Sequence, residues 1–131
     1  SDGRNAVEVK NASGPAAPST IWFMAGNTAV GLDHVHDADG NGVPEVAVLS
    51  TRNSDGRNVV EVKNAAGATN TNLMWYSKDF VARGIRVIAD TDGNGIEEAL
   101  VLMIRDSDAR ILVQGRNAAG SPKPNQYWFS P

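Results

Sequence analysis

Hydrophobic and polar residues alternate along much of the chain with the two-residue period of half-buried β-strands. Val60 and Val62, for example, alternate with the polar side chain of Glu61. Residues 45–51 and 98–104 are rich in Val, Ala, Leu and Ile and are bounded by glycine-rich loops and by Asp or Ser turns. The pattern predicts about ten strands, at residues 4–11, 20–24, 30–36, 45–51, 57–64, 72–77, 83–89, 98–104, 109–117 and 125–130.

The sequence repeats itself every 53 residues without a gap. Residues 1–25 and 54–78 share 13 identities, which composition alone does not explain. Trp22 recurs as Trp75 and Trp128. The chain therefore holds two complete units and, ahead of them, about half of another.

A repeated four-stranded antiparallel unit of about 40–60 residues is typical of a β-propeller blade. We therefore expect an all-β fold of about two and a half blades. Residues 1–26 are expected to form a half blade with its last two strands, and residues 27–79 and 80–131 to form full blades. The repeated tryptophans are expected to pack between blades; a platform on which a ligand stacks is the alternative.

Two acidic segments share the pattern D-x-D-x-N-G-x-x-E, at residues 37–45 and 90–98. Oxygen donors at alternate positions followed by a glycine allow a short loop to wrap one hard cation, and six to eight oxygens suit calcium better than magnesium. The alternative is a pair of Asx turns that bond their own backbone. The expected ligands, with Val43 and Ile96 acting through backbone carbonyls, are Asp37, Asp39, Asn41, Val43 and Glu45, then Asp90, Asp92, Asn94, Ile96 and Glu98.

With these loops between two strands of each unit, the chain resembles the FG-GAP and VCBS-type repeats of integrin α-subunit propellers and of many bacterial extracellular and lectin-like propellers. The family loop D-x-D-x-D-G-x-x-D is matched by both acidic segments, with Asn at the fifth position and Glu at the ninth. The resemblance implies calcium binding at these positions, about two ions per chain. It also implies an extracellular or cell-surface location.

Charge and composition narrow the candidate functions. The chain has 15 acidic and 12 basic side chains, a net charge of -3, and no cysteine. A mildly acidic chain without a basic stripe is not expected to bind nucleic acid. Thiol chemistry and cysteine-ligated zinc are excluded. The chain contains no run of 18 apolar residues, so no membrane span is predicted.

His34 and His36 form an HxH pair ahead of the first acidic loop. A metal-dependent enzyme is one interpretation, but zinc needs three or four ligands, and Val87 and Ala89 stand at the matching positions of the next unit. No nucleophile elbow, phosphate loop or catalytic triad is recognisable. We therefore expect no enzyme.

The sequence favours a calcium-stabilised propeller segment with a structural or recognition role. A carbohydrate-binding, lectin-like module is the alternative, since the resemblance extends to lectin-like propellers and each unit carries a tryptophan. Propellers have four to eight blades. We therefore expect either a homo-oligomer that completes the blades or a segment of a longer propeller, with a protein or a glycan as its ligand.

Overall fold

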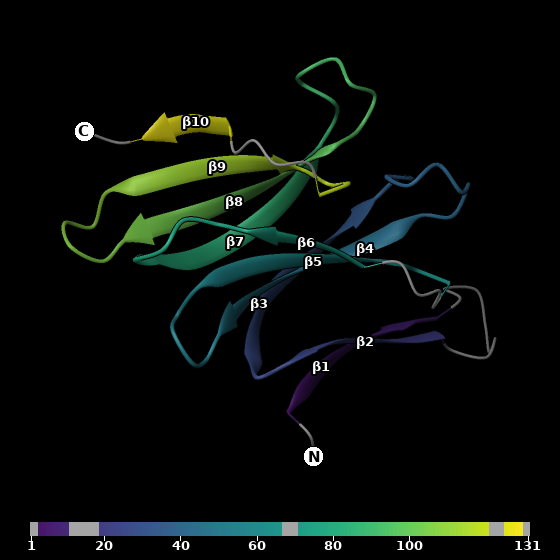
Figure 1. Cartoon of the computed structure of the whole chain (residues 1–131), viewed down its shortest axis with the longest axis horizontal. Helices are drawn as coiled ribbons and strands as arrows, with labels where there is room; N and C mark the ends of the chain where they lie inside the picture. Colours follow the sequence, from purple (N-terminus) through teal and green to yellow (C-terminus); the bar gives the residue numbers. More distant parts are fainter. Residues whose placement is uncertain (1–2, 11–18, 67–70, 121–124, 130–131) are drawn as a thin grey trace.

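The alternating pattern forms strands in every region where it was recognised. The computed structural model describes residues 3–10, 19–66, 71–120 and 125–129, and in these ranges it contains ten β-strands (Figure 1). No helix long and apolar enough to cross a membrane occurs in the same ranges. The strands are β1 (Arg4–Val9), β2 (Ser19–Ala25), β3 (Asn27–Val35), β4 (Glu45–Arg52), β5 (Asn58–Asn64), β6 (Thr71–Trp75), β7 (Phe80–Ile88), β8 (Glu98–Arg105), β9 (Ile111–Asn117) and β10 (Asn125–Phe129).

The strands pair into three antiparallel sheets in chain order. β1 and β2 form a hairpin, which we call the first sheet; β3 to β6 form the second sheet and β7 to β10 the third. Every strand of the two larger sheets pairs with its neighbour in sequence, so each sheet is a four-stranded meander. The all-β, antiparallel fold class predicted from the sequence is confirmed.

The first strand of each larger sheet begins three residues earlier than expected, at Asn27 and Phe80. A bulge interrupts the pairing of β3 between Ala29 and Gly31, and a matching bulge interrupts β7 between Ala82 and Gly84. An extra residue shifts the phase of the alternation, so the residues ahead of each bulge do not continue the two-residue pattern.

Most other strand ends differ from the expected ones by one or two residues. β9 begins at residue 111 rather than 109, because Ala109 lies in the preceding turn with a φ of 58°. Asn11 and Ser130, the last residues of two expected strands, lie outside the described residues.

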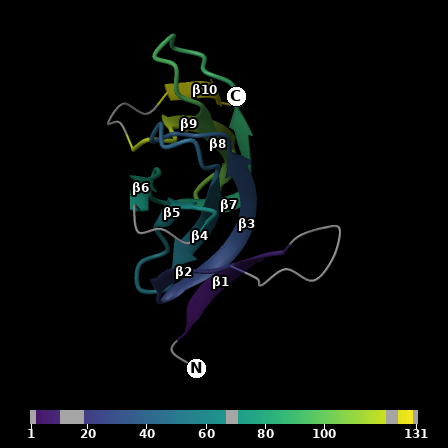
Figure 2. The same ribbon diagram turned by 90° about the vertical axis from the view of Figure 1, so that its right-hand side faces the viewer.

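The three sheets follow one another along the molecule, with the hairpin at one end and the third sheet at the other (Figures 1 and 2). The second sheet is covered on both faces. Ala47 and Leu49 belong to the core shared with the third sheet, whereas Val46 and Val48 pack in a smaller core with Phe23 of the hairpin. Burial on both faces explains why residues 46–49 are continuously apolar.

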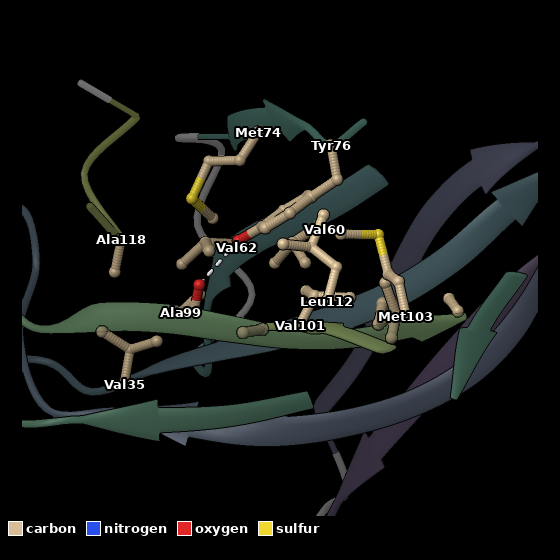
Figure 3. Close-up of a cluster of buried hydrophobic side chains, with 13 residues drawn as sticks. Val35, Val60, Val62, Met74, Tyr76, Ala99, Val101, Met103, Leu112 and Ala118 are labelled. Atoms are coloured by element: carbon tan, nitrogen blue, oxygen red, sulfur yellow. Dashed lines mark hydrogen bonds between the residues drawn. The ribbon is translucent and has the colours of Figure 1, made fainter. Parts of the chain in front are cut away.

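Tyr76, directly after β6, lies in the core between the second and third sheets (Figure 3). Its ring packs with Val101, Met103 and Leu112, and its hydroxyl donates a hydrogen bond of 2.7 Å to the backbone carbonyl of Ala99. Burial raises the pKa of Tyr76, so the hydroxyl remains a donor. This hydrogen bond therefore connects the second sheet to the third.

The aromatic residues of the core are Phe23 and Tyr76, which are 3% and 1% exposed, and not the tryptophans that precede them. Trp22 is 49% exposed and Trp75 is half-buried. Successive strand residues point to opposite faces, so burying residue 23 directs Trp22 outward. The expected packing of Trp22 between sheets is therefore wrong; the side chain of Trp128 lies outside the described part of the chain.

Candidate metal centres

The two acidic segments form the loops between the first and second strands of the larger sheets. Residues 36–44 connect β3 to β4 and residues 89–97 connect β7 to β8, and both loops project from the same side of the molecule (Figure 1). Gly42 and Gly95, at the sixth position of each motif, have φ values of 81° and 82°. Glycine adopts this left-handed conformation without a steric penalty, which lets the chain turn back around its own donors.

In the first loop, backbone amides orient the acidic side chains. The carboxylate of Asp37 accepts hydrogen bonds of 2.9 Å from the backbone amides of Asn41 and Gly42. Asp39 accepts one of 2.9 Å from the side-chain amide of Asn41. Carboxylate oxygens of Asp37, Asp39 and Glu45 lie within 4.8 Å of one another.

The second loop repeats this arrangement. Asp90 accepts hydrogen bonds from the backbone amides of Gly95 at 2.6 Å and Gly93 at 2.8 Å. These bonds, the one from Gly95 foremost, lower the pKa of Asp90. Carboxylate oxygens of Asp90, Asp92 and Glu98 lie within 4.8 Å of one another. Each loop therefore gathers a triad of carboxylates that can hold a metal ion.

Asx turns are also present in both loops. The side-chain oxygen of Asn41 accepts a hydrogen bond of 2.7 Å from the Val43 amide, and Asn94 accepts one of 2.8 Å from the Ile96 amide. These turns hold Asn41 and Asn94 in the loops, as the motif requires. Coordination by the two asparagines and by the backbone carbonyls of Val43 and Ile96 stays a prediction.

The turns do not explain the two glutamates. Glu45 and Glu98 are 4% and 1% exposed. Their Oε2 atoms accept hydrogen bonds of 2.8 Å, from the amide of Ala38 and from the amide and hydroxyl of Thr91. Among the described residues, neither Oε1 atom has a hydrogen-bond partner. Each triad thus contains a buried carboxylate oxygen for which no described residue provides a hydrogen bond.

The electrostatics of the first triad oppose ionisation of its glutamate. Burial raises the pKa of Glu45, and the neighbouring charges of Asp39 and Asp37 raise it further. A buried anion needs a counter-charge to remain stable in its ionised form. A divalent cation at the triad would supply that charge and a partner for Oε1. The residues present therefore fit a hard cation.

A small cavity of about 190 Å³ separates the two loops. Glu97 lines it, and its carboxylate accepts a hydrogen bond of 2.6 Å from the backbone amide of His36. This bond ties the second acidic loop to the end of the strand that leads into the first. Glu97 was not among the residues predicted from the sequence. Pro44 stands at the matching repeat position, and this difference was the available signal that the two loops are not equivalent here.

The HxH pair forms no comparable cluster. The side chain of His34 is 80% exposed, and its Nδ1 atom lies 3.5 Å from Asp33. The other carboxylate oxygen of Asp33 accepts a hydrogen bond of 2.8 Å from the Val87 amide, so this aspartate links β3 to β7. In the described ranges, groups of three metal-ligating side chains occur only at the two acidic loops.

No family model, no curated protein and no solved structure matches the chain.

Proposed function

We propose that this chain is a calcium-stabilised segment of a β-propeller that serves as a structural or recognition scaffold. The observation that carries the proposal is the buried, unpartnered Oε1 atom in each of two carboxylate triads, at Glu45 and Glu98. Calcium accepts oxygen ligands at flexible geometry, whereas magnesium keeps several waters. Two bound calcium ions would change the formal charge of -3 to +1.

Sheet order supports the propeller part of the proposal. Two four-stranded antiparallel meanders follow one another, and their first strands, β3 and β7, contact each other. Propellers arrange blades in this way around a central axis. In this interpretation the hairpin β1–β2 supplies the last two strands of a preceding blade.

The exposure of the loops supports an extracellular setting, which the family resemblance also implies. Asp39 and Asp92 are exposed, and an asparagine replaces one carboxylate in each loop. Fewer charges and partly exposed ligands lower calcium affinity. Such a site is suited to the calcium concentrations of about 0.1–1 mM at which extracellular modules bind.

The test is thermal unfolding with calcium and with a chelator. Binding to the native state alone stabilises it by mass action, by about 2.7 kcal/mol at a ligand concentration of 100 times Kd. We expect the chelator to lower the midpoint of the wild type, and the double substitution Asp37→Ala and Asp90→Ala to remove this response. Asp106→Ala, an exposed aspartate outside the loops, is the matched control that keeps it. If the wild-type protein melts at the same temperature with calcium and with the chelator, the calcium proposal is wrong.

Assembly through the open face of the third sheet belongs to the same proposal. A mostly apolar hollow of about 310 Å³ on this face is lined by Gly84, Ile85, Arg86, Leu100, Leu102 and Val113. Leu102 is 42% exposed, whereas Leu49, one repeat earlier, is fully buried by the third sheet. We propose that a second copy of the chain covers this face, as the third sheet covers the second.

A lectin-like module is the second candidate, and one observation favours it. Trp22 is 49% exposed, and the guanidinium of Arg4 lies 4.9 Å from the centre of its ring. An exposed aromatic face beside a donor group suits a sugar ring. Specific glycan binding that Trp22→Ala abolishes without unfolding the protein would support this function, and a glycan array without signal above background would remove it.

A further inference from the structure

A polar cleft of about 690 Å³ lies between the second and third sheets, away from the acidic loops. Asp55 and Arg57 enter it from the turn that follows β4, at the other end of that strand from the first acidic loop. Its floor and walls come from the segment after β6 and from β9. The lining residues are Asp55, Arg57, Tyr76, Ser77, Lys78, Gln114 and Arg116.

The cleft collects positive charge. Arg57, Lys78 and Arg116 are cationic, whereas Asp55 is the one acid among the lining residues. The Asp55 carboxylate is already bound to the guanidinium of Arg52, with a 2.8 Å hydrogen bond from Nε. The cleft therefore carries more positive charge than its own acid can balance.

Both arginines have donors without acceptors. The Nε atoms of Arg57 and Arg116 are buried and have no hydrogen-bond partner among the described residues. Burial lowers the pKa of Arg116, and the nearby positive charge of Arg57 lowers it further. Two guanidiniums that repel each other and keep unsatisfied donors are stabilised when an anion joins them.

The rest of the cleft holds these groups in place. The amide and the hydroxyl of Ser77 both donate hydrogen bonds of 3.0 Å to Oε1 of Gln114, which is 3% exposed. The guanidinium of Arg116 lies 5.6 Å from the centre of the Tyr76 ring, and that of Arg57 lies 5.1 Å from the centre of the Trp75 ring. Aromatic faces orient cations in this way.

The preceding sheet interface provides a comparison within the same chain. There the backbone amide of Met24 donates a hydrogen bond of 2.9 Å to the carboxylate of Glu61. These two residues occupy the repeat positions of Ser77 and Gln114. Lys63, one repeat before Arg116, pairs with Glu61 at 3.0 Å and lies 5.3 Å from the centre of the Phe23 ring. The two interfaces share a backbone bond and a cation on an aromatic ring.

The difference between the interfaces is the counter-charge. Glu61 neutralises Lys63, whereas Gln114 keeps the hydrogen bond but brings no charge to Arg116. Lys78 adds a further cation where Ala25 stands one repeat earlier. The interface between the second and third sheets therefore resembles the one between the first and second, but it lacks the carboxylate that balances the cation.

We propose that this cleft binds a tetrahedral oxyanion, a sulfate or phosphate group, held by Arg57 and Arg116 with Lys78 at the rim. Guanidinium groups donate paired hydrogen bonds to such oxygens. A dianion also balances the excess positive charge better than a carboxylate does. This site is separate from the acidic loops and stands whether or not calcium binds there.

The test is an NMR titration of the full chain with sodium sulfate at constant ionic strength. We expect saturable shifts of the Nε–Hε signals of Arg57 and Arg116. Acetate is expected to bind at least about tenfold more weakly. Absence of saturable shifts at these arginines would overturn the site, and acetate binding as tight as sulfate binding would overturn the preference for a dianion.

One substitution restores the arrangement of the earlier interface. Gln114→Glu should accept from Ser77 as Glu61 accepts from Met24, pair with Arg116, and weaken sulfate binding at least about tenfold while the fold is kept. Arg116→Gln should weaken it by a similar factor. Lys10→Gln removes one charge at the same repeat position in the hairpin, outside the cleft, and should leave the affinity unchanged. Sulfate binding that survives Gln114→Glu would refute the proposal.

Discussion

The side-chain amide of Asn58 donates a hydrogen bond of 2.7 Å to the backbone carbonyl of Phe80, and so joins β5 to the first residue of the third sheet. Asn58 is fully buried, and its side-chain oxygen accepts a hydrogen bond of 2.9 Å from the hydroxyl of Thr51. One repeat earlier, the side-chain amide of Asn5 donates a hydrogen bond of 3.0 Å to the backbone carbonyl of Asn27. The same asparagine therefore connects each sheet to the next.

Replacing Asn58 should weaken the chain more than replacing Asn5. Asn58→Ala removes the partner of the part-buried Phe80 carbonyl and of the part-buried Thr51 hydroxyl, and it leaves a gap at a fully buried position, so the loss should be about 1–3 kcal/mol. Asn5 is only half-buried, so water can replace its side chain in Asn5→Ala. Urea unfolding of both variants measures the difference, and an equal loss in free energy of unfolding would contradict it.

Glu45→Gln should affect the metal-free and the calcium-loaded protein in opposite directions. Without metal, the substitution removes a buried charge that faces Asp37 and Asp39, so the free energy of unfolding should rise by about 1 kcal/mol. With calcium, it removes a charged ligand, so the stabilisation by the ion should fall. Thermal midpoints in chelator and in calcium check both signs.

Glu97→Gln is the matched control for that experiment. Glu97 lies between the loops but outside the carboxylate triads, and a glutamine can still accept the hydrogen bond from the His36 amide. The calcium response should persist. A calcium response equally reduced in both variants would show that net charge, and not the triad, binds the ion.

The ion pair of Asp108 should contribute to acid resistance. A hydrogen bond from Arg105 lowers the pKa of Asp108 from 3.8 to about 2. Between these values the folded chain binds fewer protons than the unfolded chain, so the stabilisation is present above pH 3.8 and is lost as the pH falls through 2. Asp108→Asn should therefore lower the thermal midpoint at pH 6, and the difference from wild type should disappear near pH 2.

Asp106→Asn removes the same charge two residues earlier, at an exposed position. It should not reproduce this pH-dependent difference. If both variants follow the same curve, the net charge of the turn and not the Arg105 pair determines the acid response.

Leu102→Lys should weaken self-association. Leu102 lies on the apolar face of the third sheet that no other sheet covers in the described part of the chain, and burying a lysine there would be unfavourable. Sedimentation velocity at micromolar concentrations should show a wild-type oligomer and a smaller species for the variant. Leu73→Lys, at another exposed leucine, should keep the wild-type size. A monomeric wild type would contradict this prediction.

The repeat made the strands and both acidic loops predictable. Alternation of apolar residues indicates burial on one face, and the continuous apolar run at residues 46–49 indicates burial on both. The start of β3 was missed because the bulge before Gly31 breaks the alternation. Local pattern alone does not contain this information, since bulges depend on pairing with the neighbouring strand.

In the candidate sites, too, features set by residues close in sequence were predictable, and features that depend on distant residues were not. Spacing alone identified Asp37 and Glu45, because one loop brings together ligands that are close in sequence. The interface role of Gln114 was missed, since its partner Ser77 lies 37 residues away. Comparing the repeats would have shown Glu61 replaced by Gln114, but not that this replacement leaves Arg116 without a counter-charge.

Ala109→Gly should stabilise the chain. Ala109 has a φ of 58°, a left-handed conformation in which an alanine is strained by about 1–2 kcal/mol. One repeat earlier the same turn contains Gly56 with a φ of 69°, and the amides of both residues donate to the carbonyl of the arginine four residues before, Arg105 or Arg52. The greater freedom of glycine in the unfolded chain offsets part of the relief, so we expect the free energy of unfolding to rise by about 0.5–1 kcal/mol.

Gly56→Ala is the reciprocal variant. A Cβ at this position would meet no atom within 4 Å, so any loss of stability comes from the backbone alone. Urea unfolding should show opposite shifts of the two midpoints, and a loss of stability in Ala109→Gly would disprove the strain at this turn.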